Sequence, residues 1–389
     1  MNFNILKPFG RSKTTAVIEK STIESAVAAS PVRTQSRPRV MLCAPSGARE
    51  RLLASKQFEF IPCGKADLEV LKRMHASQID GVLLHFEVGV ATGTLLEFVN
   101  AARTNFPDLP CFTLCNHNDQ KEIGKYGWQV IAARDLTSVS EIEQKLQSQM
   151  FFFPWLTREV LRNALVTLRT MPAEAASHQH IVKELQNPKF SLEEIAKFIK
   201  RDQAITAQLL KIVNSAAFSR GDAVSDVTEA VLILGAVKLQ ALILSAWAFF
   251  MIDESACPGF RPKEEWEHAV LIAAQVRKIC EAEGMTSRLT ETAITAALLH
   301  DIGKLLLAAN RPNEYAKVLE GVKLKQATFW QEENELFGFN HAEVAGCLLS
   351  QWGVPFAVAQ AVILHHADDL EEGSIASLIQ KAHTQDAEA

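Results

Sequence analysis

The feature that most constrains the fold is a change in hydrophobic pattern near residue 150. Before it, short apolar runs such as VMLCAP, GVLLHF and PCFTLC alternate with segments of helical spacing. This alternation predicts buried strands in a parallel sheet that helices cover on both faces. After it, strand-like runs largely vanish and apolar residues recur at helical spacing, as Leu192, Ile195 and Ile199 do. The chain is therefore expected to join an α/β domain to an all-α domain.

Three segments follow from this pattern. Residues 1–36 are rich in Ser, Thr, Ala and basic residues without sustained periodicity, which predicts a disordered tail. Residues 37–148 are expected to form the α/β domain and residues 149–389 the helical domain.

Local signals mark where individual helices begin and end. Gly235 and Gly303 are expected to end helices, because glycine favours the backbone conformations found at helix ends. Asn340 followed by Glu343 is a variant of the capping box and predicts a helix start.

The bulk composition excludes several functional classes. The 389 residues are 48% apolar and 22% charged, which suits a chain with a buried core. The net charge of -5 is spread over interspersed residues of both signs, so no field favours a nucleic acid as partner. Seven cysteines without a CxxC pair predict buried free thiols. Together with the absence of a secretory signal at the start of this sequence, they predict a cytoplasmic protein.

Residues 230–252 need a separate test, because this apolar stretch has nearly membrane-spanning length. Lys238 and Gln240 lie near its middle and Gly235 interrupts it. A charge at that depth is costly in lipid. We therefore expect two buried helices and no membrane span.

The order of strands across residues 38–148 resembles the receiver domain of response regulators, which has a flavodoxin-like parallel sheet. The resemblance implies an acidic pair after the first strand, a phosphoacceptor Asp after the third, Ser or Thr after the fourth and Lys after the fifth. At these places the sequence has Ala44-Pro45-Ser46, His85, Cys115 and Arg134. Without the carboxylates magnesium has no site, and without the Asp no acyl phosphate forms. We therefore predict a degenerate receiver-like domain that binds partners or itself.

Two alternatives concern single residues of this domain. His85 could itself be phosphorylated, although no neighbouring residue in the sequence supplies a metal. Cys111 and Cys115 could form a redox pair, but on one strand they would lie about 13 Å apart, which is too far for a disulfide. A polar strand end and two buried small residues are the simpler expectations.

The helical half carries a long ordered pattern, IVKELQNPKFSLEEIAKFIKRDQAITAQLLKIVNSAAFS followed by SDVTEAVLILGAVKLQALIL. It contains the pairs Asp202-Gln203 and Asn214-Ser215 and an AVxxLG turn that ends at Gly235. This pattern resembles the signature of the HDOD family, a signal output domain related to the HD superfamily. The resemblance implies a helical bundle in a signalling protein. Asn214 and Ser215 are expected to satisfy backbone groups at a helix end, and Asp202 to act as a helix cap or surface acid.

Histidines and one His-Asp pair recur further along this half, namely His268, His300, Asp301, His341, His365 and His366. Distant helices of a bundle can direct such side chains into one interior site. In the HD superfamily, residues at matching positions bind one or two divalent metals, and Lys304 matches a lysine that contacts phosphate in the phosphodiesterase branch. The resemblance thus implies a site for iron, manganese or another divalent transition metal. The alternative is a set of hydrogen-bonded core histidines.

Two details qualify this ligand set. His365 and His366 are adjacent on a predicted helix and point about 100° apart, so only one is expected to share the site unless the helix breaks. The closing Asp of the superfamily is replaced by His383, which could bind a metal but adds no negative charge. The glycine-tyrosine-proline motif of the cyclic-di-GMP phosphodiesterase branch is also missing after His366.

Three functions remain compatible with the sequence. The favoured one is a non-catalytic signalling module that acts on other signalling proteins. The second is a metal-dependent phosphohydrolase or phosphodiesterase acting on a nucleotide, with His300 and Asp301 as metal ligands and Lys304 holding phosphate. The third is a sensor that binds a nucleotide ligand without turnover. A homodimer is compatible with each.

Overall fold

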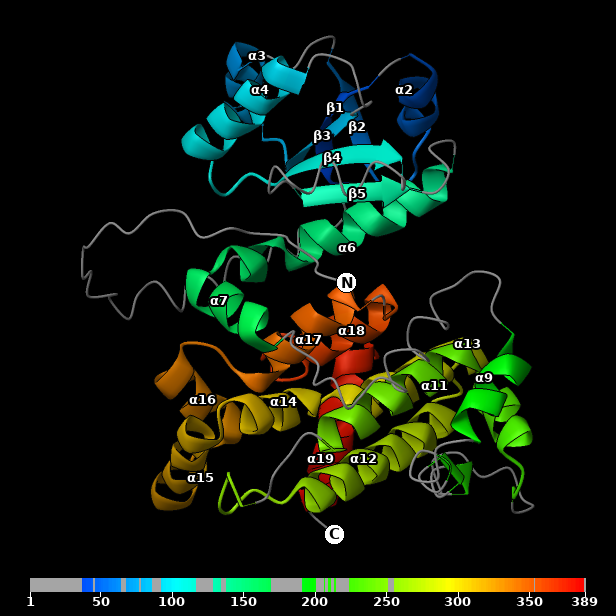
Figure 1. The fold of residues 1–389 in the computed structure, drawn as a ribbon. Helices are drawn as coiled ribbons and strands as arrows, with labels where there is room; N and C mark the ends of the chain where they lie inside the picture. The colour runs from blue at the N-terminus through cyan, green and yellow to red at the C-terminus, as the bar shows by residue number, and fades with distance from the viewer. Residues whose placement is uncertain are drawn as a thin grey trace. The chain divides into compact units, whose positions relative to one another are not determined.

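The computed structural model describes residues 37–44, 46–63, 68–76, 78–85, 92–116, 129–133, 138–168, 191–200, 206, 209–210, 213–214, 224–250, 255–352 and 354–387. The predicted tail at residues 1–36 lies outside the described residues, as do Arg134, Asp202, Gln203 and Ser215. The chain divides into two compact units, Met1–Pro154 and Trp155–Ala389 (Figure 1).

The first unit is built on a five-stranded parallel sheet with the order β2-β1-β3-β4-β5. The elements in chain order are β1 (Arg39–Cys43), α2 (Ser46–Leu53), β2 (Glu59–Pro62), α3 (Leu68–Ala76), β3 (Gly81–His85), α4 (Thr92–Asn105), β4 (Cys111–Asn116), β5 (Gln129–Ala133) and α6 (Val139–Thr157). Strand β1 is central, since Val40 lies opposite Phe60 of β2 on one side and Gly81 of β3 on the other. This strand order is that of flavodoxin-like folds, so the predicted fold class is confirmed.

Helices cover both faces of the sheet because alternate residues of its strands point in opposite directions. One face packs against α3 and α4 through a buried cluster that includes Met41, Leu71, Val82, Leu84, Val99, Cys111 and Cys115. The other face packs against α2 and α6 through a cluster that includes Val40, Leu42, Leu52, Leu83, Phe112, Leu114, Ile142 and Leu146. Cys111 and Cys115 are both buried on the same face, as expected for two residues four apart on one strand.

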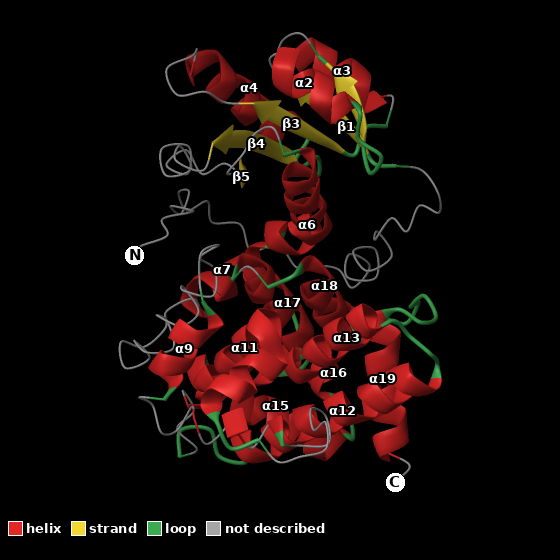
Figure 2. Ribbon diagram, turned by 90° about the vertical axis from the view of Figure 1, so that its right-hand side faces the viewer, coloured by secondary structure: helices red, strands yellow, loops and turns green. Residues whose placement is uncertain are grey.

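The described part of the second unit consists of helices and loops, with no strand (Figure 2). Its helices are α7 (Glu159–Leu168), α9 (Leu192–Ile199), α11 (Val227–Phe250), α12 (Pro262–Ala282), α13 (Ser287–Leu299), α14 (Ile302–Asn310), α15 (Pro312–Lys325), α16 (Phe329–Phe337), α17 (His341–Gln351), α18 (Phe356–Leu364) and α19 (Ile375–Ala387). The predicted all-helical architecture is confirmed.

The segment from Asn214 to α11 follows the sequence expectations. The Asn214 side-chain amide donates to the carbonyl oxygens of Leu210 and Val224, and its oxygen accepts from the Val224 backbone N–H, each at 2.8 Å. Asn214 therefore satisfies backbone groups, as predicted. Helix α11 is broken at Gly235, whose φ of 71° and ψ of 174° are not helical. Glycine tolerates this conformation because it has no Cβ atom.

One stretch in the described part of the chain, Ser287–Asn310, meets the length and hydropathy of a membrane span. It comprises α13 and α14, and 89% of its apolar window is buried within the protein. Buried core helices pass the same test, so this is weak evidence for a span.

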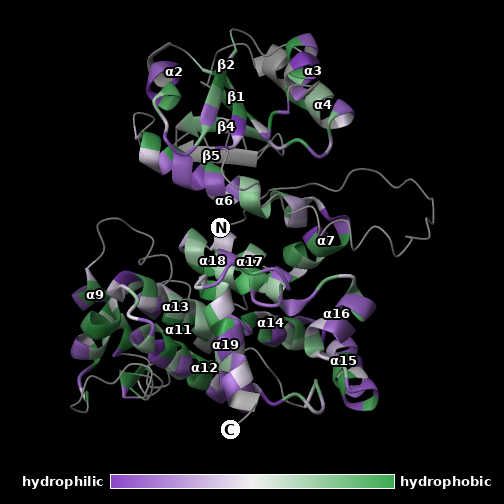
Figure 3. Ribbon diagram, turned by 180° about the vertical axis from the view of Figure 1, so that it is seen from behind, coloured by the Kyte–Doolittle hydropathy of each residue, from purple (hydrophilic) through white to green (hydrophobic). Residues whose placement is uncertain are grey.

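Helices α17 and α18 pack closely against each other, and this contact places histidines of both segments side by side. Both helices are largely hydrophobic, whereas α15 and α16 carry long polar stretches (Figure 3). Gly346 of α17 lies so close to α18 that a Cβ atom there would be 2.5 Å from the Ile363 Cβ. This close contact brings the start of α17, with His341, next to the end of α18, with His365 and His366.

Candidate metal centre

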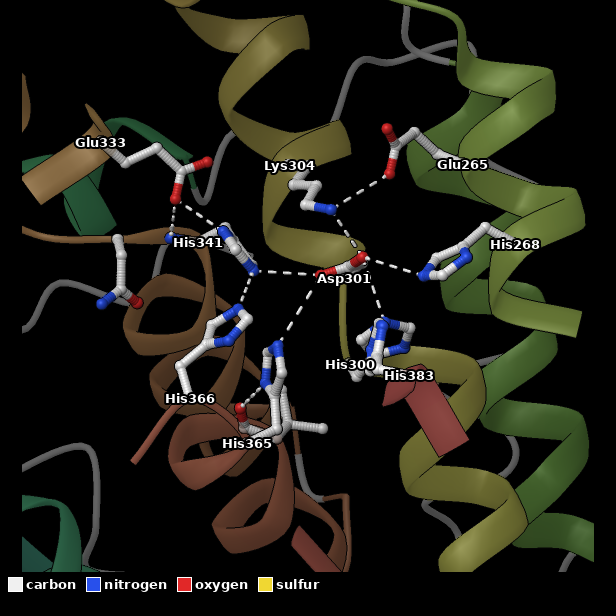
Figure 4. Close-up of polar contacts among 12 residues, drawn as sticks. Glu265, His268, His300, Asp301, Lys304, Glu333, His341, His365, His366 and His383 are labelled. Carbon is white, nitrogen blue, oxygen red and sulfur yellow. Dashed lines mark hydrogen bonds and ion pairs between the residues drawn. The ribbon is translucent and has the colours of Figure 1, made fainter. Parts of the chain in front are cut away.

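Seven side chains on or at the ends of six helices meet in the second unit (Figure 4). They are His268 within α12, His300 as C-cap of α13, Asp301 as N-cap of α14, His341 as first residue of α17, His365 and His366 directly after α18, and His383 within α19. The structure thus brings together all six residues predicted as metal ligands, together with His383. Except for His268, the predicted six lie at helix ends.

The Asp301 carboxylate lies at the centre and faces imidazoles through both oxygens (Figure 4). Its Oδ1 is 3.0 Å from His341 Nε2 and 3.8 Å from His365 Nε2. Its Oδ2 is 3.1 Å from His300 Nε2 and 3.9 Å from His268 Nε2. One carboxylate therefore lies between two sets of nitrogen donors.

The donors form two groups, in each of which the ligand atoms lie within 4.8 Å of one another. The first, here called the Asp301 group, consists of Asp301, His341, His365 and His366. The second, here called the three-imidazole group, consists of His268, His300 and His383.

His365 and His366 both join the Asp301 group because the helix ends before them. Helix α18 stops at Leu364, and both histidines lie in the following turn. His366 Nε2 reaches to 3.0 Å from His341 Nε2, and its ring stacks on Trp330. The condition set by the sequence, a break in the helix, is met.

Two local features fix His341. The capping box is confirmed, since the Asn340 side chain accepts from the Glu343 backbone N–H and Glu343 accepts from that of Asn340. The prediction that Gly303 ends a helix is wrong, because Gly303 lies in the first turn of α14. A Cβ atom at Gly303 would lie 2.0 Å from the His341 carbonyl oxygen, so glycine is required for the close approach of α14 to α17.

Glu333 orients His341 from the side opposite Asp301. Its Oε2 accepts from the ring Nδ1 at 2.6 Å and from the His341 backbone N–H at 2.8 Å, while Oε1 accepts from the Tyr315 hydroxyl at 2.8 Å. Such carboxylate–histidine pairs direct the other ring nitrogen toward a metal. Sequence reasoning missed Glu333, because nothing in EENELF distinguishes it from Glu332 or Glu335.

Hydrogen bonds also fix the rings of His300 and His365. Their Nδ1 atoms each lie 2.7 Å from a backbone carbonyl oxygen, of Ala297 and Val362 respectively. A carbonyl only accepts, so Nδ1 carries the hydrogen and Nε2 of the neutral ring carries the lone pair. The His365 Nε2 is buried without a hydrogen-bond partner among the described residues.

The His365 lone pair lies 3.8 Å from Asp301 Oδ1, and His300 Nε2 lies 3.1 Å from both Asp301 Oδ2 and His383 Nε2. A nitrogen lone pair that faces a buried carboxylate is repelled unless a cation lies between them. Imidazole nitrogens and a carboxylate oxygen are ligands that divalent transition metals accept. The residues present therefore fit such a metal.

The pKa shifts of the clustered histidines agree with binding of a divalent metal. Burial lowers the pKa of His366 to about 2 and that of His383 to about 3, and it also lowers the pKa of His365. Neutral imidazole is the form that binds a metal. His341 differs: burial opposes a charge, but Glu333 and Asp301 outweigh it and raise the His341 pKa to about 9. In the metal-free protein, the protonated His341 ring therefore supplies the positive charge between Glu333 and Asp301.

The Lys304 ammonium group pairs with two carboxylates of the protein itself. Its Nζ lies 2.7 Å from Asp301 Oδ2, 3.4 Å from Glu265 Oε2 and 4.6 Å from the centre of the Phe329 ring. Lys304 is only 8% exposed, and although burial opposes its charge, the two carboxylates raise its pKa. Burial in turn raises the pKa of Glu265, a neighbour of the site that sequence reasoning also missed.

The comparison with protein families identifies an HDOD domain at residues 171–368, which is half of the chain. An uncharacterized protein of Treponema pallidum (strain Nichols) is 26% identical over 186 residues. The match covers 48% of this chain and 36% of that protein, so the chain spans only about a third of the length of this relative.

Three solved structures resemble the chain, each with a TM-score under 0.5. An HDOD domain protein of unknown function from Geobacter sulfurreducens is 23% identical, covering 58% of this chain and 76% of that one, with a TM-score of 0.45. A protein proposed to be a metal-dependent phosphohydrolase from Shewanella amazonensis SB2B is 21% identical, covering 59% and 83%, with a TM-score of 0.41. A protein proposed to act in signal transduction from Marinobacter aquaeolei VT8 is 15% identical, covering 83% and 78%, with a TM-score of 0.42.

Proteins similar to this chain thus carry names from signal transduction and from phosphohydrolases. The match over residues 171–368 includes every metal ligand predicted from the sequence and leaves out only His383 of the seven clustered side chains. On this match, the chain belongs to the HDOD family.

Proposed function

We propose that this protein is a cytoplasmic signal-transduction protein whose HDOD domain holds a divalent transition metal and acts by binding other signalling proteins. The observation that carries the metal is the buried Asp301 carboxylate, which imidazole nitrogens face on both sides. Iron, manganese and other divalent transition metals accept this donor set. When bound, the metal supplies positive charge that holds several helix ends together.

The surroundings of Lys304 favour binding over hydrolysis. A lysine that holds a substrate phosphate must offer its ammonium group to the substrate, whereas Lys304 is buried between Asp301 and Glu265. The ligand set also has a single carboxylate, because His383 stands where the superfamily has an Asp. Two divalent ions close together would be poorly neutralised by one negative charge.

For the first unit we propose a degenerate receiver domain that binds partner proteins or a second copy of this chain. The support is its strand order, combined with Ala44 after β1, His85 at the end of β3 and Cys115 in β4 at the places where a receiver needs its phosphorylation residues. Incubation of the full chain with acetyl phosphate and Mg²⁺ should leave the protein unphosphorylated. A phosphoryl group found on His85 by mass spectrometry would contradict this.

The experiment for the second unit combines metal analysis with a turnover assay. The full chain is purified without chelators, its metal content is measured, and the loaded protein is incubated with cyclic dinucleotides, guanosine polyphosphates and bis(p-nitrophenyl) phosphate. We expect bound metal that is lost in His300→Ala, and no turnover. Metal content below about a tenth of an equivalent, with a melting temperature unchanged by added manganese or iron, would contradict the metal site.

The second candidate function is a metal-dependent phosphohydrolase. It is favoured by the three-imidazole group, because three protein ligands leave a coordination position for water, and by the proximity of Lys304 to Asp301. Metal-dependent turnover that His300→Ala abolishes would establish this function and exclude the non-catalytic one. Binding of a nucleotide without turnover would instead identify a sensor.

A further inference from the structure

We propose that Arg158, which joins α6 to α7, is a positioning residue for the proposed metal ligand His341 and that metal affinity depends on it. This inference rests on the proposed metal-binding function and deepens it by naming a residue outside the ligand set that controls its geometry. Arg158 precedes residues 171–368, which match the family, so this role is a feature of this chain.

The Arg158 guanidinium group binds both ends of the short segment that contains His341. Its Nη1 donates to Glu343 Oε1 at 2.5 Å, and its Nη2 donates to the carbonyl oxygen of Gly338. Gly338 lies three residues before His341, and Glu343 lies two residues after it. Because the guanidinium group is planar and rigid, two such bonds fix the ends of the segment relative to each other.

Glu343 transmits this restraint to the start of α17. Its Oε2 accepts from the Asn340 backbone N–H at 3.3 Å, and its own backbone N–H donates to the Asn340 side chain at 3.0 Å. This capping box sets where α17 begins, and His341 is the first residue of the helix. The Glu343 side chain is only 11% exposed, so removal of the Arg158 guanidinium would leave a buried carboxylate without its cation, which is unfavourable.

The same carboxylate also bonds to α6. The Trp155 side chain, in the last turn of α6, donates a hydrogen bond to Glu343. Further back along this helix, Ile142 belongs to the core of the first unit. A displacement of the last turn of α6 would therefore change the bonds that Trp155 and Arg158 make to Glu343 and, through the capping box, the position of His341.

The surroundings of His341 leave little tolerance for such a change. Its Nε2 lies 3.0 Å from Asp301 Oδ1 and its Nδ1 lies 2.6 Å from Glu333 Oε2, so the ring is held on both sides (Figure 4). Distances from a metal to its ligands vary by only about 0.2 Å. A shift of a few tenths of an ångström at the start of α17 is therefore expected to weaken metal binding in the Asp301 group.

The test titrates the metal-free full chain with Mn²⁺ by calorimetry and measures the melting temperature of each variant by circular dichroism. Arg158→Gln should weaken Mn²⁺ binding about tenfold, at the lower end of the effect of outer-shell partners. Arg158→Lys should fall between Arg158→Gln and the wild type, because it keeps the charge but not the planar fork. A role in stability alone would lower the melting temperature of Arg158→Gln without weakening Mn²⁺ binding, and would overturn the inference. Lys145→Gln, which removes a partly exposed ion pair with Glu141 in the first unit, is the matched control and should leave the affinity unchanged.

A double-mutant cycle tests whether Arg158 acts through Glu343. Glu343→Gln keeps a side chain that suits a capping box but removes the charge that Arg158 binds. Arg158→Gln should therefore weaken Mn²⁺ binding much less in the Glu343→Gln background than in the wild type. Equal effects in the two backgrounds would show that Arg158 does not act through Glu343 and would overturn the inference.

The outcomes separate this inference from the proposed function. If Arg158→Gln binds Mn²⁺ as tightly as the wild type while His341→Ala loses metal, the positioning role is refuted and the proposed metal function stands. If the wild type itself binds neither Mn²⁺ nor Fe²⁺, both are refuted. Should Arg158→Gln fail to fold, Arg158→Lys takes its place, and an unchanged affinity in that variant also overturns the inference.

Discussion

The two units of this protein differ in their candidate metal ligands, which among the described residues gather in the helical unit. In the α/β unit, β3 ends at His85 and β4 contains Cys115, at the places where the resemblance to receiver domains implies an Asp and a Ser or Thr. In the helical unit, distant residues still meet around Asp301 with their donor atoms aligned. A buried hydrophobic pattern can maintain a fold without a site, whereas histidines gathered around a buried carboxylate form a cluster that could hold a metal.

Of the changes considered, replacing the Asp301 carboxylate should have the largest effect on metal binding and stability. In Asp301→Asn, metal binding should be lost, and the metal-free protein should lose about 2–3 kcal/mol of unfolding free energy, because buried Lys304 keeps only Glu265 as partner. Metal analysis and urea denaturation measure both quantities. Asp80→Asn in the α/β unit, where the carboxylate accepts from the Arg39 backbone N–H, should leave metal content unchanged. Equal metal loss in both variants would contradict a metal site that belongs to the helical unit alone.

Two glycines offer a matched comparison of packing. Gly303→Ala places a Cβ atom against the His341 carbonyl, so α14 and α17 must separate and unfolding free energy should fall by about 2–3 kcal/mol or more, with loss of metal. At Gly81, in β3, a Cβ would meet Met150 and Pro110 at ordinary contact distance. Gly81→Ala should therefore change stability by less than about 1 kcal/mol. Normal metal content in Gly303→Ala would mean that His341 does not need this close approach.

A subtler change tests the orientation of His341. Glu333→Gln keeps the shape of the side chain but removes the charge that holds the His341 Nδ1 hydrogen, so metal affinity in the Asp301 group should fall about 10–100-fold. Glu332→Gln is the control, because Glu332 pairs with Lys325 and makes no bond to a histidine. Calorimetric titration measures both. Unchanged affinity in Glu333→Gln would remove Glu333 from the site.

The pH dependence should differ in sign between the metal-free and metal-bound protein. The metal-free His341 pKa is raised from 6.5 to about 9, so its contribution is fully present below pH 6.5 and disappears as the pH rises through about 9. Stability should fall by about 3 kcal/mol over this window in the presence of chelator. With metal in excess, stability should rise over the same window, because protons compete less for the imidazoles. Parallel curves in urea denaturation would contradict a metal bound by His341.

The sequence predicted most of the candidate site through the resemblance to the HD superfamily, and local helix signals agree with the positions of some ligands. The His-Asp pair at His300 and Asp301 marks a helix junction, and the Asn340 cap places His341 at the start of α17. Gly303 shows where such local reasoning fails. The requirement for glycine there comes from the carbonyl oxygen of His341, 38 positions later in the chain, which leaves no room for a Cβ atom.

The amino-acid sequence alone predicted the division into an α/β and a helical part, a parallel sheet covered by helices on both faces, and the residue types able to hold a metal, since hydrophobic period and side-chain chemistry are local properties. Only the tertiary structure selected Glu333 among three nearby glutamates, ended α18 so that both His365 and His366 turn inward, and placed His383 beside His300. Each of these depends on the approach of helices distant in the chain, and side-chain distances of about 3 Å are set by packing that no local pattern encodes.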